Sequence, residues 1–400
     1  MLSRRNFLSA TGAGLAGVAA ANQARALSPA RAHDTPDPWL EVSADALRHN
    51  VREIAHLAEG RPVLAVVKNN AYGLGLAVVG PILDGAPEVN GLAVVKTGEA
   101  VALREAGVRK PILVMGAVSD DEAVELVRSD VRLAPFDDNA ETRLAAIARR
   151  AGRPVHVHLD IDTGMNRVGM PVERALAWAG RLVANPGITV DGAYTTFTED
   201  DAFDADQLAR FQRFTADARA QGIGLGIVHA ASSHALFFRR AALLELVRPG
   251  LALYGAYPAG ARPLSLAQLR PAFRLRARVV RVEQLEPGEG VSYGRNYVAE
   301  RPVWIATLPV GHADGYPRRA VEGCEVLIGE RTYPVIGAVS ASHTIIEVGD
   351  QARVAVGDIA TLVGWEHPAV HPNTIAERAE ISVYDVLMHL SARLPVTANG

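Results

Sequence analysis

The chain's strongest chemical signal is a lysine at the end of an apolar run. Lys68 follows Val63–Val67, a stretch typical of a buried strand, and precedes the sequence Asn-Asn-Ala-Tyr-Gly. Desolvation at the mouth of such a strand disfavours the ammonium and favours the neutral amine, the form that attacks a carbonyl. The pattern indicates either a lysine that can hold an aldehyde cofactor or, taken alone, a surface lysine that closes a strand.

Five further segments accompany this lysine in a fixed order. They are Asp162–Gly169, Arg248–Gly255, Val291–Gly294, Gly311–Arg318 and Tyr384–Leu387. Together with Ala65–Gly75, they resemble the alanine racemase family, and the resemblance covers nearly everything after about residue 38. It implies pyridoxal 5'-phosphate (PLP) as cofactor, held by Lys68, and racemisation of a free amino acid.

Racemisation requires two acid–base groups on opposite faces of the substrate, because PLP makes the Cα proton removable and a second group must return a proton from the other side. The resemblance assigns these roles to Lys68 and Tyr293. In the family this tyrosine comes from the other subunit, so a homodimer is expected. Without the resemblance, the segment Val291–Gly294 would favour a strand tyrosine that packs on an apolar face.

The expected cofactor contacts are also carried over from the family. The phosphate contacts correspond to Tyr72, Ser233, Gly250, Leu251 and Tyr384. Arg248 matches the arginine that faces the pyridine nitrogen, and His229 the histidine between that arginine and the catalytic tyrosine. A guanidinium cannot accept a hydrogen bond, so Arg248 would keep the ring nitrogen unprotonated and the ring a weaker electron sink.

The substrate side departs from the family pattern. Arg167 matches the arginine that supports the tyrosine and binds the substrate carboxylate, but Asp160 stands where many members have a carbamylated lysine. An aspartate carries the negative charge without modification, on a shorter stem. The other departures are Thr196 for a histidine, Ser232 for an asparagine, His312 for a tyrosine, and Ala341-Ser342 for a Met-Asp pair.

Smaller side chains at these positions predict a larger pocket. Replacing methionine by Ala341 and tyrosine by His312 removes wall atoms on the substrate side. We therefore expect amino acids larger than alanine to be accepted. Two alternatives stay open: another PLP reaction on the same scaffold, such as decarboxylation, aldol cleavage or elimination, and a PLP-binding protein without catalysis.

The helices and strands expected to position these residues are typical of an α/β protein. Strand patterns begin near residues 63, 91, 111, 131, 155, 189, 224 and 245, with helical patterns between them. Eight such alternations predict a (β/α)8 TIM-type barrel, with catalytic groups at the C-terminal ends of its strands. From about Pro271 alternating patterns such as Phe273–Val279 predict a mostly β domain.

We expect the barrel to span residues 45–262 and the β domain 263–400, joined by an early strand at 38–44. Residues 1–26 combine Arg4-Arg5, a short apolar stretch and Ala24-Arg25-Ala26, which predicts a twin-arginine signal peptide and a periplasmic or secreted protein. That stretch is too short for a convincing membrane span.

Composition sets further bounds. The 400 residues are 49% hydrophobic and 21% charged, with a net charge of -3, so neither nucleic acid nor an anionic membrane is an expected partner. A single cysteine, Cys324, excludes an internal disulfide, and no pattern of metal ligands is evident.

Overall fold

The computed structural model describes residues 37–321 and 323–399. The proposed signal segment at 1–26 lies outside these residues.

A parallel sheet forms the first half of the described chain. Its strands occur in sequence order, apart from the short β7 (Met170–Pro171), which pairs with β6. They are β2 (Val63–Val66), β3 (Val89–Val94), β4 (Ile112–Val114), β5 (Val131–Leu133), β6 (Val155–Asp162), β8 (Ile188–Tyr194) and β9 (Ile227–His229).

An eighth segment closes the barrel. Val247 bridges to Val63 of β2, and Leu246 bridges to His229 of β9, both in parallel register. Leu64 donates its amide to the Val247 carbonyl at 2.8 Å, which continues the pairing. The predicted (β/α)8 architecture is confirmed, with a closing segment too short to count as a full strand.

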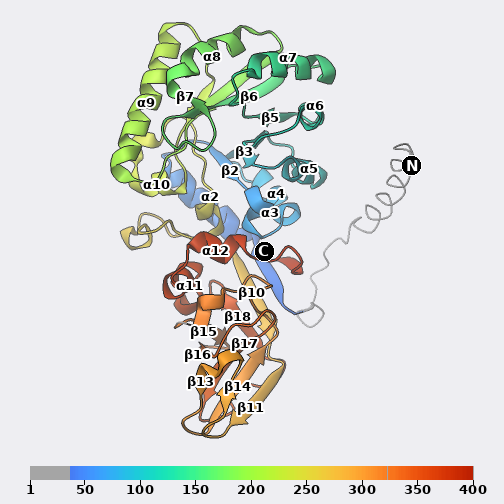
Figure 1. Cartoon of the computed structure of the whole chain (residues 1–400), viewed down its shortest axis with the longest axis vertical. Helices are drawn as coiled ribbons and strands as arrows, with labels where there is room; N and C mark the ends of the chain where they lie inside the picture. The colour runs from blue at the N-terminus through green and yellow to red at the C-terminus, as the bar shows by residue number, and fades with distance from the viewer. Residues whose placement is uncertain (1–36, 322, 400) are drawn as a thin grey trace, which may run out of the picture. The chain divides into compact units, whose positions relative to one another are not determined.

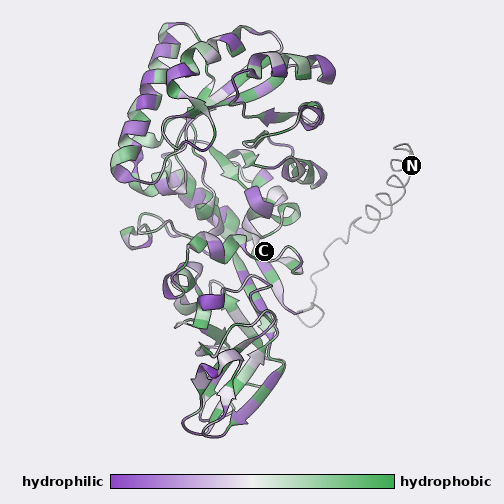
Figure 2. Ribbon diagram, viewed as in Figure 1, coloured by the Kyte–Doolittle hydropathy of each residue, from purple (hydrophilic) through white to green (hydrophobic). Residues whose placement is uncertain are grey.

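Helices alternate with the strands and pack around them (Figure 1). They are α2 (Ala44–Leu57), α4 (Leu76–Asp84), α5 (Thr97–Glu105), α6 (Asp120–Arg128), α7 (Ala140–Ala151), α8 (Val172–Ala184), α9 (Asp201–Ala220) and α10 (Ser233–Phe238). Helix α2 shows why this packing forms, since Leu47, Val51 and Ile54 recur at helical spacing and are all buried. Helix α9 carries hydrophilic (purple) and hydrophobic (green) residues along its length (Figure 2), and its buried residues include Leu208, Phe211 and Phe214.

A nine-stranded sheet dominates the second half. In spatial order it comprises β11 (Arg281–Leu285), β14 (Val303–Leu308), β17 (Thr344–Gly349), β16 (Arg331–Ile336), β15 (Glu325–Ile328), β18 (Ile359–Val363), β10 (Phe273–Arg278), β1 (Trp39–Ser43) and β19 (Val396–Asn399). Strand β10 alternates as its sequence predicts, with Phe273, Leu275 and Ala277 buried and arginines between them. The mostly β second domain is confirmed.

Three smaller features of this domain bear on the site. β12 (Gly290–Val291) and β13 (Tyr297–Val298) form a two-stranded hairpin that carries Tyr293 in its loop. Helices α11 (Pro372–Arg378) and α12 (Val383–Met388) lie between β18 and β19 in the chain, and α12 contacts the segment that begins at Lys68. None of the described helices combines the length and the apolar composition that a membrane span requires.

Candidate functional site

Lys68 begins the segment that leaves the C-terminal end of β2. The preceding Val67 still pairs with the next strand, donating its amide to the Ala93 carbonyl at 2.8 Å. Burial lowers the pKa of Lys68, the positive charge of Arg167 lowers it further, and the carboxylate of Glu99 opposes the shift. The location and the charge environment both favour a reactive amine at the barrel mouth.

The residues after Lys68 form a left-handed turn, α3 (Lys68–Tyr72). Asn69, Asn70, Ala71 and Tyr72 have φ values of 53°, 56°, 54° and 55°. A run of four is unusual because L-residues other than asparagine and aspartate rarely adopt this conformation. The turn ends at Gly73, also with positive φ, and places Tyr72 in the core.

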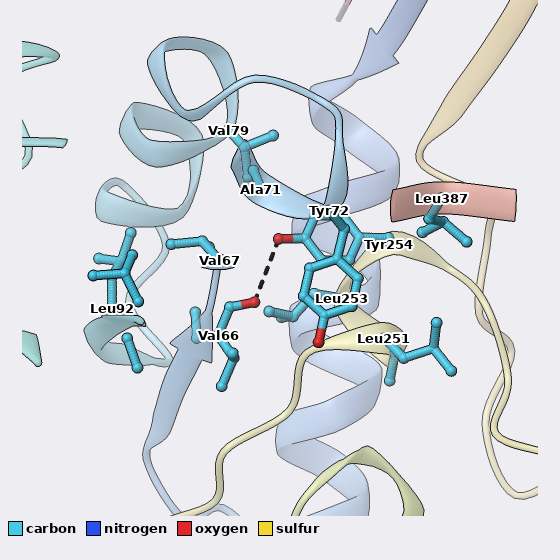
Figure 3. Close-up of a cluster of buried hydrophobic side chains, with 14 of the residues drawn as sticks. Val66, Val67, Ala71, Tyr72, Val79, Leu92, Leu251, Leu253, Tyr254 and Leu387 are labelled. Atoms are coloured by element: carbon cyan, nitrogen blue, oxygen red, sulfur yellow. Dashed lines mark hydrogen bonds between the residues drawn. The ribbon is translucent and has the colours of Figure 1, made fainter. Parts of the chain in front are cut away.

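Three tyrosines meet beneath this turn. The Tyr72 ring lies 4.7 Å from that of Tyr254 and 6.2 Å from that of Tyr384, measured between centroids. The Tyr254 hydroxyl donates to the Val66 carbonyl at 3.4 Å, the dashed line of Figure 3. Since Tyr384 belongs to α12, both halves of the chain contribute to this cluster.

A compact turn lies against the Tyr72 hydroxyl. Ser233 Oγ accepts hydrogen bonds from the amides of Gly250 at 3.0 Å and Ala252 at 3.2 Å. A Cβ at Gly250 would overlap the Tyr72 hydroxyl, so glycine permits this close approach. Leu251 then opens a 3-10 helix whose first amides have no acceptor within the helix. The hydroxyls of Tyr72 and Ser233 and the amides of the Gly250–Ala252 turn therefore lie close together. Such a set of hydrogen-bonding groups is suited to bind the phosphate of PLP.

Arg248, His229 and His158 form a buried chain of hydrogen bonds. Arg248 Nη1 donates to His229 Nδ1 at 2.8 Å, and His229 Nε2 lies 2.8 Å from His158 Nδ1. A guanidinium only donates, so His229 Nδ1 accepts and its Nε2–H donates to His158. Burial lowers the pKa of His158 to about 4 and that of His229 well below the usual histidine value, so both rings are neutral. Arg248 is thereby held as a fixed cation.

Asp160 is paired with a buried tyrosine rather than with an arginine. The Tyr194 hydroxyl donates to Asp160 Oδ2 at 3.0 Å, while its ring stacks on His229 at 5.2 Å and lies 4.7 Å from the Arg248 guanidinium carbon. Burial raises the pKa of Asp160 to about 6, against the opposing effects of the Tyr194 bond and of the arginine charges. Asp160 therefore supplies a negative charge to this site only above about that pH.

Replacing Asp160 by asparagine is expected to raise stability and lower activity. The folded protein holds the Asp160 proton more tightly than the unfolded chain, so this carboxyl lowers stability as pH rises from 3.8 through about 6. The shift corresponds to roughly 3 kcal/mol, the upper bound for the gain in D160N at pH 8. We expect kcat/KM to fall about tenfold because Arg167 loses its anionic neighbour. Thermal midpoints at pH 8 and pH 5 test this, and a D160N protein less stable than wild type at pH 8 contradicts it.

The predicted substrate-side residues lie on loops. Arg167 is exposed at the barrel mouth, where it lines a small cavity with Asp160 and Thr196. His312 and Ala341 belong to two neighbouring loops of the β domain, joined by the bond from the Ala313 amide to the Ala341 carbonyl at 3.0 Å. Both side chains are exposed in the single chain.

Tyr293 lies in the hairpin loop of the β domain, whereas Lys68 and most of the predicted cofactor residues belong to the barrel. Its side chain is 78% exposed in a short 3-10 turn, Tyr293–Arg295. An exposed aromatic residue on a hairpin loop is suited to enter the site of another subunit. The role of Tyr293, like those of the other predicted site residues, stays a prediction.

Four buried residues that lie next to the predicted ones are not among those predicted from the sequence. They are Glu99, His158, Tyr194 and Tyr254. A signal for His158 existed in the alternation of His156, His158 and Asp160 on one face of β6. Among the described residues, no group of three or more His, Cys, Asp or Glu could hold a metal ion.

Comparisons with known proteins agree along the chain. The family profile "Alanine racemase, N-terminal domain" matches residues 42–258, and "Alanine racemase, C-terminal domain" matches 272–398. An alanine racemase of Desulforamulus reducens is 34% identical over 363 residues, covering 89% of this chain and 97% of its own length. One of Symbiobacterium thermophilum is 35% identical over 366 residues, covering 89% and 96%.

Solved structures give the same result. An alanine racemase from Clostridium difficile 630 superposes with a TM-score of 0.84 at 29% identity, covering 91% of this chain and 96% of that one. The alanine racemase of the D-cycloserine producer Streptomyces lavendulae gives 0.85 at 29% identity, covering 92% and 98%.

Proposed function

This chain belongs to the alanine racemase family, whose members are PLP-dependent isomerases. We propose that it racemises its amino-acid substrate with two acid–base groups. One is Lys68, and the other is Tyr293 of the partner subunit. The site is then complete only in a homodimer. PLP, when bound, withdraws electrons from Cα and makes its proton removable.

The chain's own residues would divide the remaining work. Lys68 Nζ would hold the cofactor and move a proton on one face, and the Tyr293 hydroxyl would do so on the other. Arg248, fixed by His229, would donate to the cofactor's ring nitrogen. Ser233, Gly250, Leu251, Tyr72 and Tyr384 would hold its phosphate.

One observation carries this proposal: a half-buried lysine with a lowered pKa lies at the C-terminal end of the first barrel strand. Barrel enzymes place their catalytic groups at this end of the strands. The turn formed by Ser233 and Gly250, which is suited to bind phosphate, lies against the Tyr72 hydroxyl. Tyr72 in turn ends the segment that begins at Lys68, so the two parts of the site are adjacent.

The test is a panel of L- and D-amino acids given to the purified, PLP-loaded protein. Cα-hydrogen exchange in deuterated water and chiral composition are followed together. A racemase exchanges and inverts its substrate without releasing carbon dioxide, aldehyde or ammonia. Release of any of these as the main product would contradict the proposal and favour another PLP reaction.

The substrate is proposed to be larger than alanine. Backbone hydrogen bonds join the loops that carry His312 and Ala341, which supports placing both side chains, each smaller than its family counterpart, in one wall of the substrate pocket. Thr196 further reduces bulk at the barrel mouth. If alanine outperforms every long or polar amino acid in the panel, this part of the proposal is wrong.

Replacing Ala341 by methionine is expected to reverse this preference. The added side chain fills wall space, so kcat/KM for long substrates should fall about tenfold or more while that for alanine changes less than threefold. His343→Met, at an exposed position of the same loop outside the predicted substrate site, is the control for disturbing the loop. Equal losses for long and short substrates would contradict a role of Ala341 in pocket size.

We also propose that residues 1–26 direct export by the twin-arginine route, with Arg4-Arg5 as the recognised pair. An R4K/R5K variant should then stay in the cytoplasmic fraction while wild type is found outside it. Equal distribution of both proteins would contradict the proposal.

A further inference from the structure

We propose that Glu99 is a positioning residue that clamps the left-handed turn after Lys68 and so sets the position of the cofactor lysine. The inference rests on the proposed role of Lys68. It adds a residue that neither the motif around the lysine nor the composition of the pocket indicates.

The Glu99 carboxylate connects two loops at the barrel mouth. Glu99 lies in the first turn of α5 and is 8% exposed. Its Oε1 accepts from the Asn70 amide at 3.1 Å. Its Oε2 accepts from the amides of Val95 at 3.2 Å and Lys96 at 3.1 Å. One carboxylate thus joins the turn after β2 to the loop after β3.

The bonds to Lys96 and to its chain neighbour Val95 lie at the start of α5, whereas the bond to Asn70 does not. A glutamate at the third position of a helix commonly accepts the amide of the N-cap residue, here Lys96. The bond to Asn70 lies outside that motif, because Asn70 is 29 residues away in the turn that follows the lysine. The carboxylate also lies close enough to Lys68 to oppose the lowering of its pKa.

The turn requires such an anchor. Four consecutive left-handed residues are unfavourable, and two of them, Ala71 and Tyr72, lack the short polar side chain that eases this conformation. A bond from an amide to a buried carboxylate is stronger than one to a neutral acceptor. The Asn70 side chain adds a second anchor, since its Oδ1 accepts from the Leu76 amide at 3.1 Å.

The turn links two residues of the proposed cofactor site. Lys68 precedes its first left-handed residue, and Tyr72 is its last. If the turn relaxes toward a right-handed conformation, both side chains move together. Loss of the clamp should therefore affect attachment of the cofactor at Lys68 more than binding of the amino acid.

The experiment compares E99Q with E122Q. Glu122 occupies the same third position in α6, where it accepts from the Ser119 amide and hydroxyl, but it has no bond to the lysine turn. Glutamine at position 99 keeps the size of the side chain but replaces one acceptor oxygen with an NH2 donor. It can therefore accept hydrogen bonds from the amides of only one of the two loops. After incubation with PLP and borohydride, we measure the fraction of Lys68 that carries the reduced adduct, the cofactor absorption band, kcat and KM.

In E99Q we expect the Lys68 adduct at subsaturating PLP to fall at least fivefold, the absorption band to shift, and kcat to fall at least tenfold with KM changed less than threefold. E122Q should match wild type in all four. A further A71G change should restore at least half of the adduct to E99Q, because glycine adopts the left-handed conformation freely.

Three outcomes overturn the inference. The first is an E99Q protein that matches E122Q in adduct and absorption, whatever its thermal midpoint. The second is a loss that A71G does not relieve. If E99Q does not fold, E99D replaces it in the experiment. The third contradicting outcome is then an E99D protein that forms the Lys68 adduct to the same extent as wild type. A wild-type protein that itself forms no adduct at Lys68 refutes the proposed function instead.

Discussion

Replacing Lys68 by alanine is expected to lower kcat at least about a thousandfold for every amino acid in the panel. The change removes both the amine that holds the cofactor and one of the two proton-transfer groups. The rate is measured by chiral chromatography as the formation of the opposite enantiomer over time. The fold should persist, because Lys68 follows β2 and no strand pairing depends on its side chain.

The control for Lys68→Ala is Lys110→Ala. Lys110 lies on the loop before β4, and burial lowers the pKa of its amine too. Removal of this second lysine should leave turnover within about twofold of wild type. Retention of more than a tenth of wild-type kcat in K68A would contradict the role given to this lysine.

Replacing Tyr293 by phenylalanine is the second change with a large expected effect. It removes one hydroxyl, so turnover of at least one enantiomer should fall about a hundredfold or more. In the single chain this residue is 78% exposed, so the free energy of folding of the chain itself should change by less than about 0.5 kcal/mol. Initial rates from each pure enantiomer measure the effect, and Tyr297→Phe, in the adjacent strand β13, controls for disturbing the hairpin. Equal, near wild-type rates in both directions would contradict the two-base proposal.

Mixed dimers test where the tyrosine comes from. If Tyr293 acts in the partner's site, a dimer of one K68A chain and one Y293F chain has one intact site and one with both defects. Coexpression should then give up to about half the wild-type activity per mixed dimer. If both residues act within one chain, every site has one defect, and mixing restores nothing.

Much of the fold follows from the sequence. Eight strand patterns with helices between them predict the barrel, and the alternation at Phe273–Arg278 predicts the strand that the structure contains. The prediction works because a parallel barrel strand is a short apolar run, and an amphipathic helix has a distinct period. The closing segment at 246–247 is the least regular part, since only isolated bridges hold it.

The buried polar partners could not be predicted in the same way. Glu99 reads as an ordinary helix-capping residue, and nothing local links it to Asn70. The bond between His158 and His229 joins residues 71 positions apart, and only the closed barrel brings them together. The left-handed turn is equally hidden, because Ala71 and Tyr72 have no intrinsic preference for it. These features depend on tertiary contacts rather than on periodicity.

The covalent attachment of the cofactor is the claim on which the other proposals depend. The chain has only three lysines, Lys68, Lys96 and Lys110, so reduction with borohydride followed by peptide mapping gives an unambiguous answer. We expect a pyridoxyl group on the peptide that contains Lys68 and none on the peptides that contain Lys96 and Lys110. A label on Lys96 or Lys110 alone, or no label on a PLP-saturated protein, would contradict it.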